Sequence, residues 1–204
     1  MPKDKSGTLE KIIPSAKKEF LEKGFAGASM RSIASGAGMS AAGLYRHFEN
    51  KEMMFEALVA PVYTEFLSIY RAQTDRYFVM LENDGLDSMW DSSGQTMNMF
   101  MEYIYDHIDE FRLLFSCSEQ SPYEHFTHSL IDVEVDMTMN YIEKAREMGF
   151  PIKDINREEI HILSNAFFSC VFEMILHDVP KQRAIEMSGR FYAFFTAGWK
   201  EYML

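Results

Sequence analysis

The sequence has little of what stabilises secreted or membrane proteins. It contains two cysteines in 204 residues, Cys117 and Cys170, which are far apart and match no metal-binding spacing. Neither a disulfide framework nor a metal site is therefore expected, and a reduced cytoplasm suits the chain best. No run of about 18 uncharged apolar residues is present, so no membrane-spanning helix is expected. The first residues, MPKDKSGTLEK, lack the apolar stretch of a secretory signal.

Positive charge is also scarce, but it is unevenly distributed. The chain has 20 Lys and Arg against 31 Asp and Glu, a net charge of −11. Residues 1–51 nevertheless hold nine basic and five acidic side chains, so the excess of acid lies entirely in residues 52–204. A basic N-terminal segment followed by an acidic remainder is typical of a small nucleic-acid-binding module joined to a larger domain. Ordinary variation in surface charge would give the same numbers, so the charge distribution alone does not establish nucleic-acid binding.

The sequence lacks the sustained alternation of apolar and polar residues that strands show, and prolines and glycines punctuate helical patterns instead. We therefore predict an all-α fold. It comprises an N-terminal three-helix DNA-binding domain over residues 1–51 and a helical bundle for ligand binding and dimerisation over residues 52–204. The longer helices are expected at about 51–81, 86–106, 109–117, 121–149, 157–177 and 180–202.

Three local signals bear on helix ends. In the first helix Pro14 removes a backbone donor, so a kink or a late start is expected there. Gly24 is expected to end that helix as a C-terminal cap. The segment Ser121-Pro122-Tyr123-Glu124 combines an N-cap serine, a first-position proline and a capping-box glutamate, so it predicts a helix start.

The last two predicted helices are apolar on more than one face. Because one chain has one core to cover, a second apolar stripe near the C-terminus favours a homodimer built from two such helices of each subunit. The alternative is that both stripes are buried within one chain. The residues assigned to the subunit interface are Phe168, Phe172, Ile175, Phe191, Phe194, Phe195 and Trp199.

Residues 29–52 carry the most informative pattern. Ser29 and Ser40 can each cap a short helix, and Gly36 and Gly38 between them allow a tight turn. Leu44 and Phe48 would face inward. Two short helices joined by a glycine-containing turn are the helix-turn-helix geometry, in which the second helix enters the major groove.

Residues 9–58 resemble the DNA-binding domain of the TetR family of repressors. The first signature is F-x-x-x-G-F, present as Phe20 to Phe25. The second is T/S-x-x-x-I-A-x-x-A-G-V-S, present from Ser29 to Ser40 with Met39 for valine. The third is L-Y-x-H/Y-F-x-x-K-E, present from Leu44 to Glu52. The resemblance implies a homodimer that binds a double-stranded operator with an inverted repeat and is released by a small-molecule effector, with no cofactor, no metal and no catalysis.

The resemblance also assigns roles to single residues. The hydroxyls of Ser29 and Tyr45 would reach phosphates with His47 beside them, and Lys51 would pair with a phosphate. Bases would be read from residues 40–46. Here the sequence departs from the family, since Ala41 stands where lysine is frequent and Gly43 where threonine or serine is frequent. The remaining base contacts would come from Ser40, Ala41, Ala42, Arg46 and Arg31. As alternatives, Tyr45 and His47 are packing residues and Arg46 is solvated.

An effector pocket is expected among the helices spanning residues 86–178, where methionine and phenylalanine are frequent. Soft apolar walls suit a hydrophobic or amphipathic effector, and the carboxylate excess would suit a cation, although such charges are usually solvated. The assigned pocket residues are Trp90, Met97, Phe100, Met101, Tyr103, Phe111, Phe115, His125, His128, Phe167 and Glu173.

Two other functions remain possible from the sequence. Glu158 and His161 have the Glu-x-x-His spacing of a helical metal enzyme, but a di-metal bundle needs a second such pair, and none exists. The C-terminal domain could also dock a protein in place of a small molecule. Activation in place of repression is a further alternative.

Overall fold

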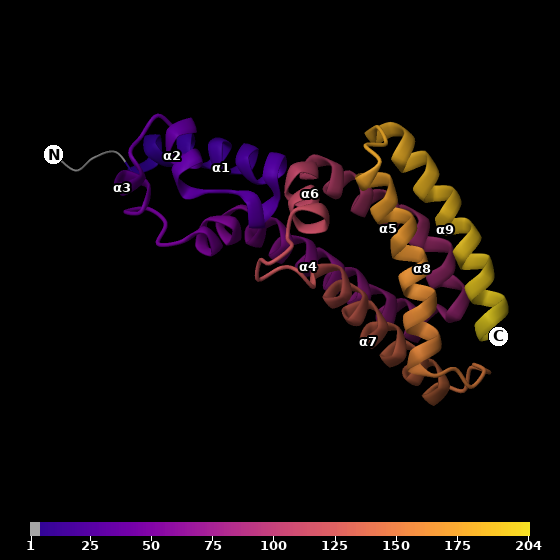
Figure 1. Cartoon of the computed structure of the whole chain (residues 1–204). Helices are drawn as coiled ribbons and strands as arrows, with labels where there is room; N and C mark the ends of the chain where they lie inside the picture. The colour runs from indigo at the N-terminus through magenta and orange to yellow at the C-terminus, as the bar shows by residue number, and fades with distance from the viewer. Residues whose placement is uncertain (1–4) are drawn as a thin grey trace. The chain divides into compact units, whose positions relative to one another are not determined.

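The computed structural model describes residues 5–204, with the side chains of residues 7–86 and 94–204. The described chain is helical throughout and contains no strand, so the all-α prediction is confirmed (Figure 1). Its helices are α1 (Lys5–Gly27), α2 (Met30–Gly36), α3 (Ala41–Leu44), α4 (Lys51–Asp84), α5 (Leu86–Asp106), α6 (Ile108–Ser116), α7 (Phe126–Glu147), α8 (Arg157–Leu176) and α9 (Lys181–Met203).

These helices form two compact units. Unit 1 comprises the described residues up to Glu65 together with His107–Phe126, and unit 2 comprises Phe66–Asp106 and Thr127–Leu204. The N-terminal unit therefore takes in α6 from the middle of the sequence and extends past residue 51 along α4. The predicted domain boundary between residues 51 and 52 stays a prediction.

The core of unit 1 forms around one face of α1. Ile12, Ala16 and Phe20 recur at helical spacing and are fully buried. The ring of Phe20 meets the ring of Phe55 edge to face, with centroids 5.1 Å apart. α6 is joined to α1 by an ion pair between Lys17 and Glu110. These contacts hold the first turns of α4 and the whole of α6 against α1.

The end of α1 is defined by glycine. Gly24 is the non-helical residue inside α1, with φ +67°, so the predicted cap at Gly24 is confirmed. The late start that Pro14 predicted is wrong, because α1 already begins at Lys5 and continues through Pro14. The N–H of Phe25 then donates to the carbonyl of Cys117, 2.8 Å away, which gives the freed backbone a partner.

Unit 2 is built from the second part of α4 with α5, α7, α8 and α9. In it α9 packs along α5 and against α8. α8 begins with a complete capping box, in which Asn156 accepts from the N–H of Glu159 and Glu159 accepts from the N–H of Asn156. By length and composition α8 is also the one described helix that could cross a membrane. Seven of its residues are buried inside the unit, as in the core helix of a folded domain.

The helix start predicted at Ser121 is wrong. Residues 121–125 form turns, and α7 begins at Phe126. The hydroxyl of Ser121 accepts from the N–H of Tyr123 at 3.0 Å, two residues ahead, which makes a local turn and not a helix cap. Serine favours both motifs, so the local signature did not distinguish them.

Candidate DNA-binding surface and effector pocket

Two short helices of unit 1 have the predicted helix-turn-helix connection. Ser29 caps α2 by accepting from the N–H of Ser32, and Ser40 caps α3 by accepting from the N–H of Gly43, each at 3.1 Å. Gly38 between them has φ +69°, a conformation that other residues rarely adopt. Leu44 is buried below α3, as predicted. The two serine caps and the glycine turn therefore form the predicted helix-turn-helix connection.

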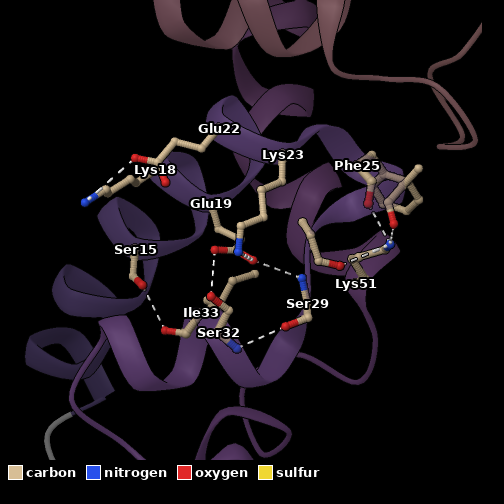
Figure 2. A network of polar contacts seen from close by, with 12 residues as sticks. Ser15, Lys18, Glu19, Glu22, Lys23, Phe25, Ser29, Ser32, Ile33 and Lys51 are labelled. Carbon is tan, nitrogen blue, oxygen red and sulfur yellow. Dashed lines mark hydrogen bonds and ion pairs between the residues drawn. The ribbon is translucent and has the colours of Figure 1, made fainter.

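A buried carboxylate attaches the start of α2 to α1. Glu19 is 7% exposed and accepts from the hydroxyl of Ser32 at 2.7 Å, the ammonium of Lys23 at 3.0 Å and the N–H of Ser29 at 3.3 Å (Figure 2). Burial alone would raise the pKa of Glu19, but these hydrogen bonds outweigh burial and lower the pKa below its usual value. Ser15 adds a hydrogen bond to the carbonyl of Ile33, 2.8 Å away.

Lys51 is engaged within unit 1. Its ammonium donates to the carbonyls of Phe25 at 2.6 Å, Ala26 at 3.3 Å and Ala28 at 3.4 Å (Figure 2). It also lies 4.4 Å from the ring centroid of Phe25. Since an ammonium has three N–H donors, these carbonyls use all of them. The geometry gives Lys51 a structural role at the end of α1 and does not favour the phosphate contact that we predicted for it.

Six of the nine predicted DNA-contact residues are exposed in unit 1. Tyr45 is 52% exposed, and Arg31 and Arg46 are exposed without an ion pair to any described residue. Ser29, Ser40 and Ala42 are exposed as well, whereas Ala41, His47 and Lys51 are half-buried. Hydroxyl, guanidinium and methyl groups thus lie together on and beside the two short helices.

Unit 2 contains a cavity of about 220 Å³ that is partly open to solvent. Four predicted effector residues, Met97, Phe100, Met101 and Phe167, line it. The lining also takes residues from α4 and α9, which lie outside the 86–178 span that we had expected. The complete described lining is Phe66, Tyr70, Gln73, Thr74, Tyr77, Thr96, Met97, Phe100, Met101, Ile104, Glu134, Met137, Thr138, Tyr141, Phe167, Phe168, Val171, Tyr192, Phe195, Thr196, Trp199 and Met203.

The other predicted pocket residues lie elsewhere. Phe111, Phe115 and His125 belong to unit 1. Tyr103 and His128 belong to unit 2 but are absent from the lining. Glu173 is exposed on α8 and pairs with His177 at 2.9 Å. The side chain of Trp90 lies outside the described residues.

The sequence interpretation missed the polar groups of the cavity. Glu134 accepts from the hydroxyl of Thr138 at 3.3 Å, and burial raises its pKa to about 7. The Gln73 Oε1 and the Tyr141 hydroxyl are buried with no hydrogen-bond partner among the described residues, and burial raises the pKa of Tyr141 to about 12. A signal existed, because Glu134 follows the apolar Leu130 by four residues and so interrupts an apolar helix face.

The apolar face that unit 2 leaves open includes part of the predicted interface, namely Phe194, Phe195 and Trp199. Phe168, Phe172 and Ile175 point into the unit, and Ile175 is only 1% exposed, so it has no surface for a second subunit. Phe194 is 74% exposed. It borders an apolar hollow between α8 and α9, lined by Leu163, Phe194, Phe195, Gly198, Trp199 and Tyr202. Phe191 is half-buried.

The candidate metal ligands are dispersed. In the part of the chain that the structure describes, no three His, Cys, Asp or Glu side chains come together. His161 is 3.8 Å from Asp132, and Glu158 is exposed in the first turn of α8. His125 and His128 are both exposed.

Comparison with known proteins supports the helix-turn-helix assignment of the N-terminal helices. The sequence model of the bacterial regulatory proteins of the tetR family matches residues 12–58. A TetR-like transcriptional regulator from Rhodococcus sp. RHA1 is similar in structure, with a TM-score of 0.63 and 16% identity over 96% of this chain and 98% of that one. The TetR family regulator PfmR from Thermus thermophilus has a TM-score of 0.62 and 18% identity over 91% and 97%.

NalD, the secondary repressor of the MexAB-OprM multidrug efflux pump in Pseudomonas aeruginosa, has a TM-score of 0.58 and 17% identity over 98% of both chains. Identities at this level show the shared fold, and the family model covers the helix-turn-helix itself. Residues 12–58 therefore match the DNA-binding domain of the tetR family, and the chain as a whole has the fold of TetR-like transcriptional regulators.

Proposed function

We propose that this chain is a ligand-responsive repressor that acts as a homodimer in the cytoplasm. The observation that carries the proposal is the cavity of about 220 Å³ in unit 2, in a chain whose other unit is a helix-turn-helix. A mainly apolar cavity with a few polar groups is the usual form of a small-molecule site. Its volume suits a small molecule, which favours an effector over a docked protein.

The DNA contacts are assigned to the exposed and half-buried side chains on and beside α2 and α3. Ser29 and Tyr45 carry hydroxyls for phosphates, with the imidazole of His47 beside them. Arg46 and Arg31 supply the long donors that pair with guanine, and Ala41 and Ala42 supply methyl groups for thymine. Ser40, as the cap of α3, lies at the same edge. Because few long polar side chains are available to contact bases, DNA shape would contribute to specificity.

The dimer is assigned to the apolar face around Phe194. An aromatic side chain that is 74% exposed costs free energy in water, and a second copy covering it would recover that cost. Phe191, Phe195 and Trp199 of the same helix would complete the contact. Two-fold symmetry then places one helix-turn-helix on each half of an inverted repeat, with half-sites roughly 34–36 Å apart or a multiple of that distance.

Ligand response is assigned to α4. This one helix begins at Lys51 in unit 1 and carries the cavity residues Phe66, Tyr70 and Gln73. An effector that binds one position of α4 better than another would shift the population between operator-bound and free states, and only a difference in affinity can do so. Repression is favoured over activation because the related NalD is a repressor.

The test is binding of the purified protein to DNA upstream of its own gene, measured by fluorescence anisotropy over a range of salt concentrations. We expect tight, steeply salt-dependent binding to an inverted repeat, since each phosphate contact releases a counterion. A cavity ligand at saturation should weaken that binding while sedimentation still shows a dimer. Dissociation into monomers on ligand binding would contradict the proposed gating.

A further inference from the structure

The cavity of unit 2 contains one acid and no base among its described lining residues. Glu134 is that acid, and the lining includes no Lys, Arg, His or Asp. The other titratable side chains that face the cavity are tyrosines: Tyr70, Tyr77, Tyr141 and Tyr192. An ionised Glu134 therefore has no counter-ion in the described wall.

The hydrogen bonding of Glu134 is incomplete. One oxygen accepts from the Thr138 hydroxyl at 3.3 Å, which is a long bond for two oxygens. An ionised carboxylate has about four acceptor sites, so most of them are unused. Burial without a compensating charge disfavours the ionised form and raises the pKa of Glu134 to about 7. A partner that brings positive charge and N–H donors would reverse this cost.

A second group in the wall needs the same kind of partner. The Oε1 of Gln73 on α4 is a buried acceptor without a donor among the described residues. A buried acceptor left unpaired is unfavourable, so a ligand that donates a hydrogen bond to it binds more tightly than one that does not. The remaining wall is aromatic, as shown by the rings of Phe66 and Phe100, whose centroids are 5.6 Å apart.

We propose that the effector of this cavity is a lipophilic amine, whose protonated nitrogen donates to Glu134 and Gln73 and whose apolar body packs among the aromatic rings. The assignment rests on the proposed function, since it names the class of ligand that the cavity takes. Charge-assisted hydrogen bonds are about twice as strong as neutral ones. Aromatic faces also attract a cation. A neutral ligand of the same shape gains only the apolar contacts.

The test compares two probes of equal shape by titration calorimetry, 4-phenylbutylamine and the neutral 4-phenylbutan-1-ol. The wild-type protein should bind the amine at least about tenfold more tightly, a difference of about 1.4 kcal/mol. Glu134→Gln should remove that preference and leave the affinity for the alcohol within about threefold, since the apolar contacts remain. The matched control is Glu173→Gln, which neutralises an exposed carboxylate outside the cavity lining and should change neither affinity.

The pH profile gives an independent readout. With a pKa of about 7, the ionised fraction of Glu134 rises about tenfold between pH 6 and pH 8, so the affinity for the amine should rise by that factor. Tyr77 and Tyr141 stay neutral in this range, because burial raises the pKa of each above the usual value for tyrosine. The affinity for the alcohol, and that of Glu134→Gln for the amine, should be flat.

Equal affinities for amine and alcohol in the wild-type protein, absence of amine binding, or an unchanged amine affinity in Glu134→Gln would each overturn the proposal. These outcomes leave the proposed regulator intact, because its operator binding is measured separately. Conversely, a tight amine complex that binds operator DNA as well as the free protein does would keep the ligand class and contradict ligand-gated repression.

Discussion

Removal of the Glu19 carboxylate should destabilise unit 1, even though the residue lies outside the helix-turn-helix. The change to test is Glu19→Ala. It deprives the Ser32 hydroxyl and the Ser29 N–H of their acceptor and breaks the ion pair with Lys23. Hydrogen bonds to a charged group contribute about 1.5–3 kcal/mol each, and an orphaned buried donor costs about 1–3 kcal/mol.

The surroundings of the three donors narrow the expected loss of stability in Glu19→Ala. Ser29 is exposed, so water can replace the lost acceptor there, and the half-exposed ammonium of Lys23 gains little from its pair. The Ser32 bond is the shortest and is only partly accessible. We therefore expect Glu19→Ala to lower the free energy of unfolding by about 2–3 kcal/mol. Glu19→Gln keeps the shape and can still accept from Ser29, so its cost should be about 1 kcal/mol.

Urea unfolding followed by circular dichroism measures both values. The control is Glu22→Ala, one turn further along α1, where the exposed carboxylate pairs only with Lys18 at 3.8 Å; its effect should be close to zero. The folded pKa of Glu19 lies below the usual 4.5, so the stabilisation is present above that pH and disappears as pH falls through the folded pKa. Equal unfolding midpoints for Glu19→Ala and Glu22→Ala would refute the reasoning.

The remaining predictions concern binding, assembly and pH. Lys51→Gln should lower stability by about 1–3 kcal/mol in urea yet leave the salt slope of DNA binding unchanged, whereas loss of a phosphate contact would reduce that slope by about 1. Tyr45→Phe should weaken operator binding about tenfold at an unchanged thermal midpoint; equal affinity would remove Tyr45 from the contact surface. Phe194→Asp should give monomers on sedimentation, and Val79→Asp, at a site 55% exposed, should not. Because the folded pKa of Glu134 is raised to about 7, its ionisation destabilises the protein as pH rises, so Glu134→Gln should be more stable by up to about 3 kcal/mol at pH 8 and no different below pH 4.5.

The sequence predicted best what depends on neighbouring residues. The caps Ser29 and Ser40, the turn at Gly38 and the inward Leu44 all lie within one short stretch, and their interactions span only a few positions. Local conformational preferences are therefore sufficient to predict the structure of this stretch. Ser121 is the counter-example, because a serine that can cap a helix can equally close a turn.

Features that depend on distant partners were not predictable. The carbonyls that hold Lys51 come from residues 23 to 26 positions earlier in the chain, which no local pattern reveals. On α8 residues from more than one apolar face are buried, among them Ile160 and Met174 as well as Phe168 and Ile175, so the sequence pattern did not reveal which residues face a partner. Of the polar groups of the cavity, Gln73 lies on α4, outside the expected span of residues 86–178, whereas Glu134 and Tyr141 lie within that span but were not assigned to the pocket.

The place of α6 limits how this protein could be recombined with others. Residues 107–126 belong to unit 1 although they are far from the helix-turn-helix in the sequence. In a chimera that grafts only residues 1–51 onto a foreign effector domain, Lys17 loses Glu110 and the N–H of Phe25 loses its acceptor at Cys117. The donor module is thus discontinuous, and a functional exchange of specificity has to transplant α6 together with the N-terminal helices.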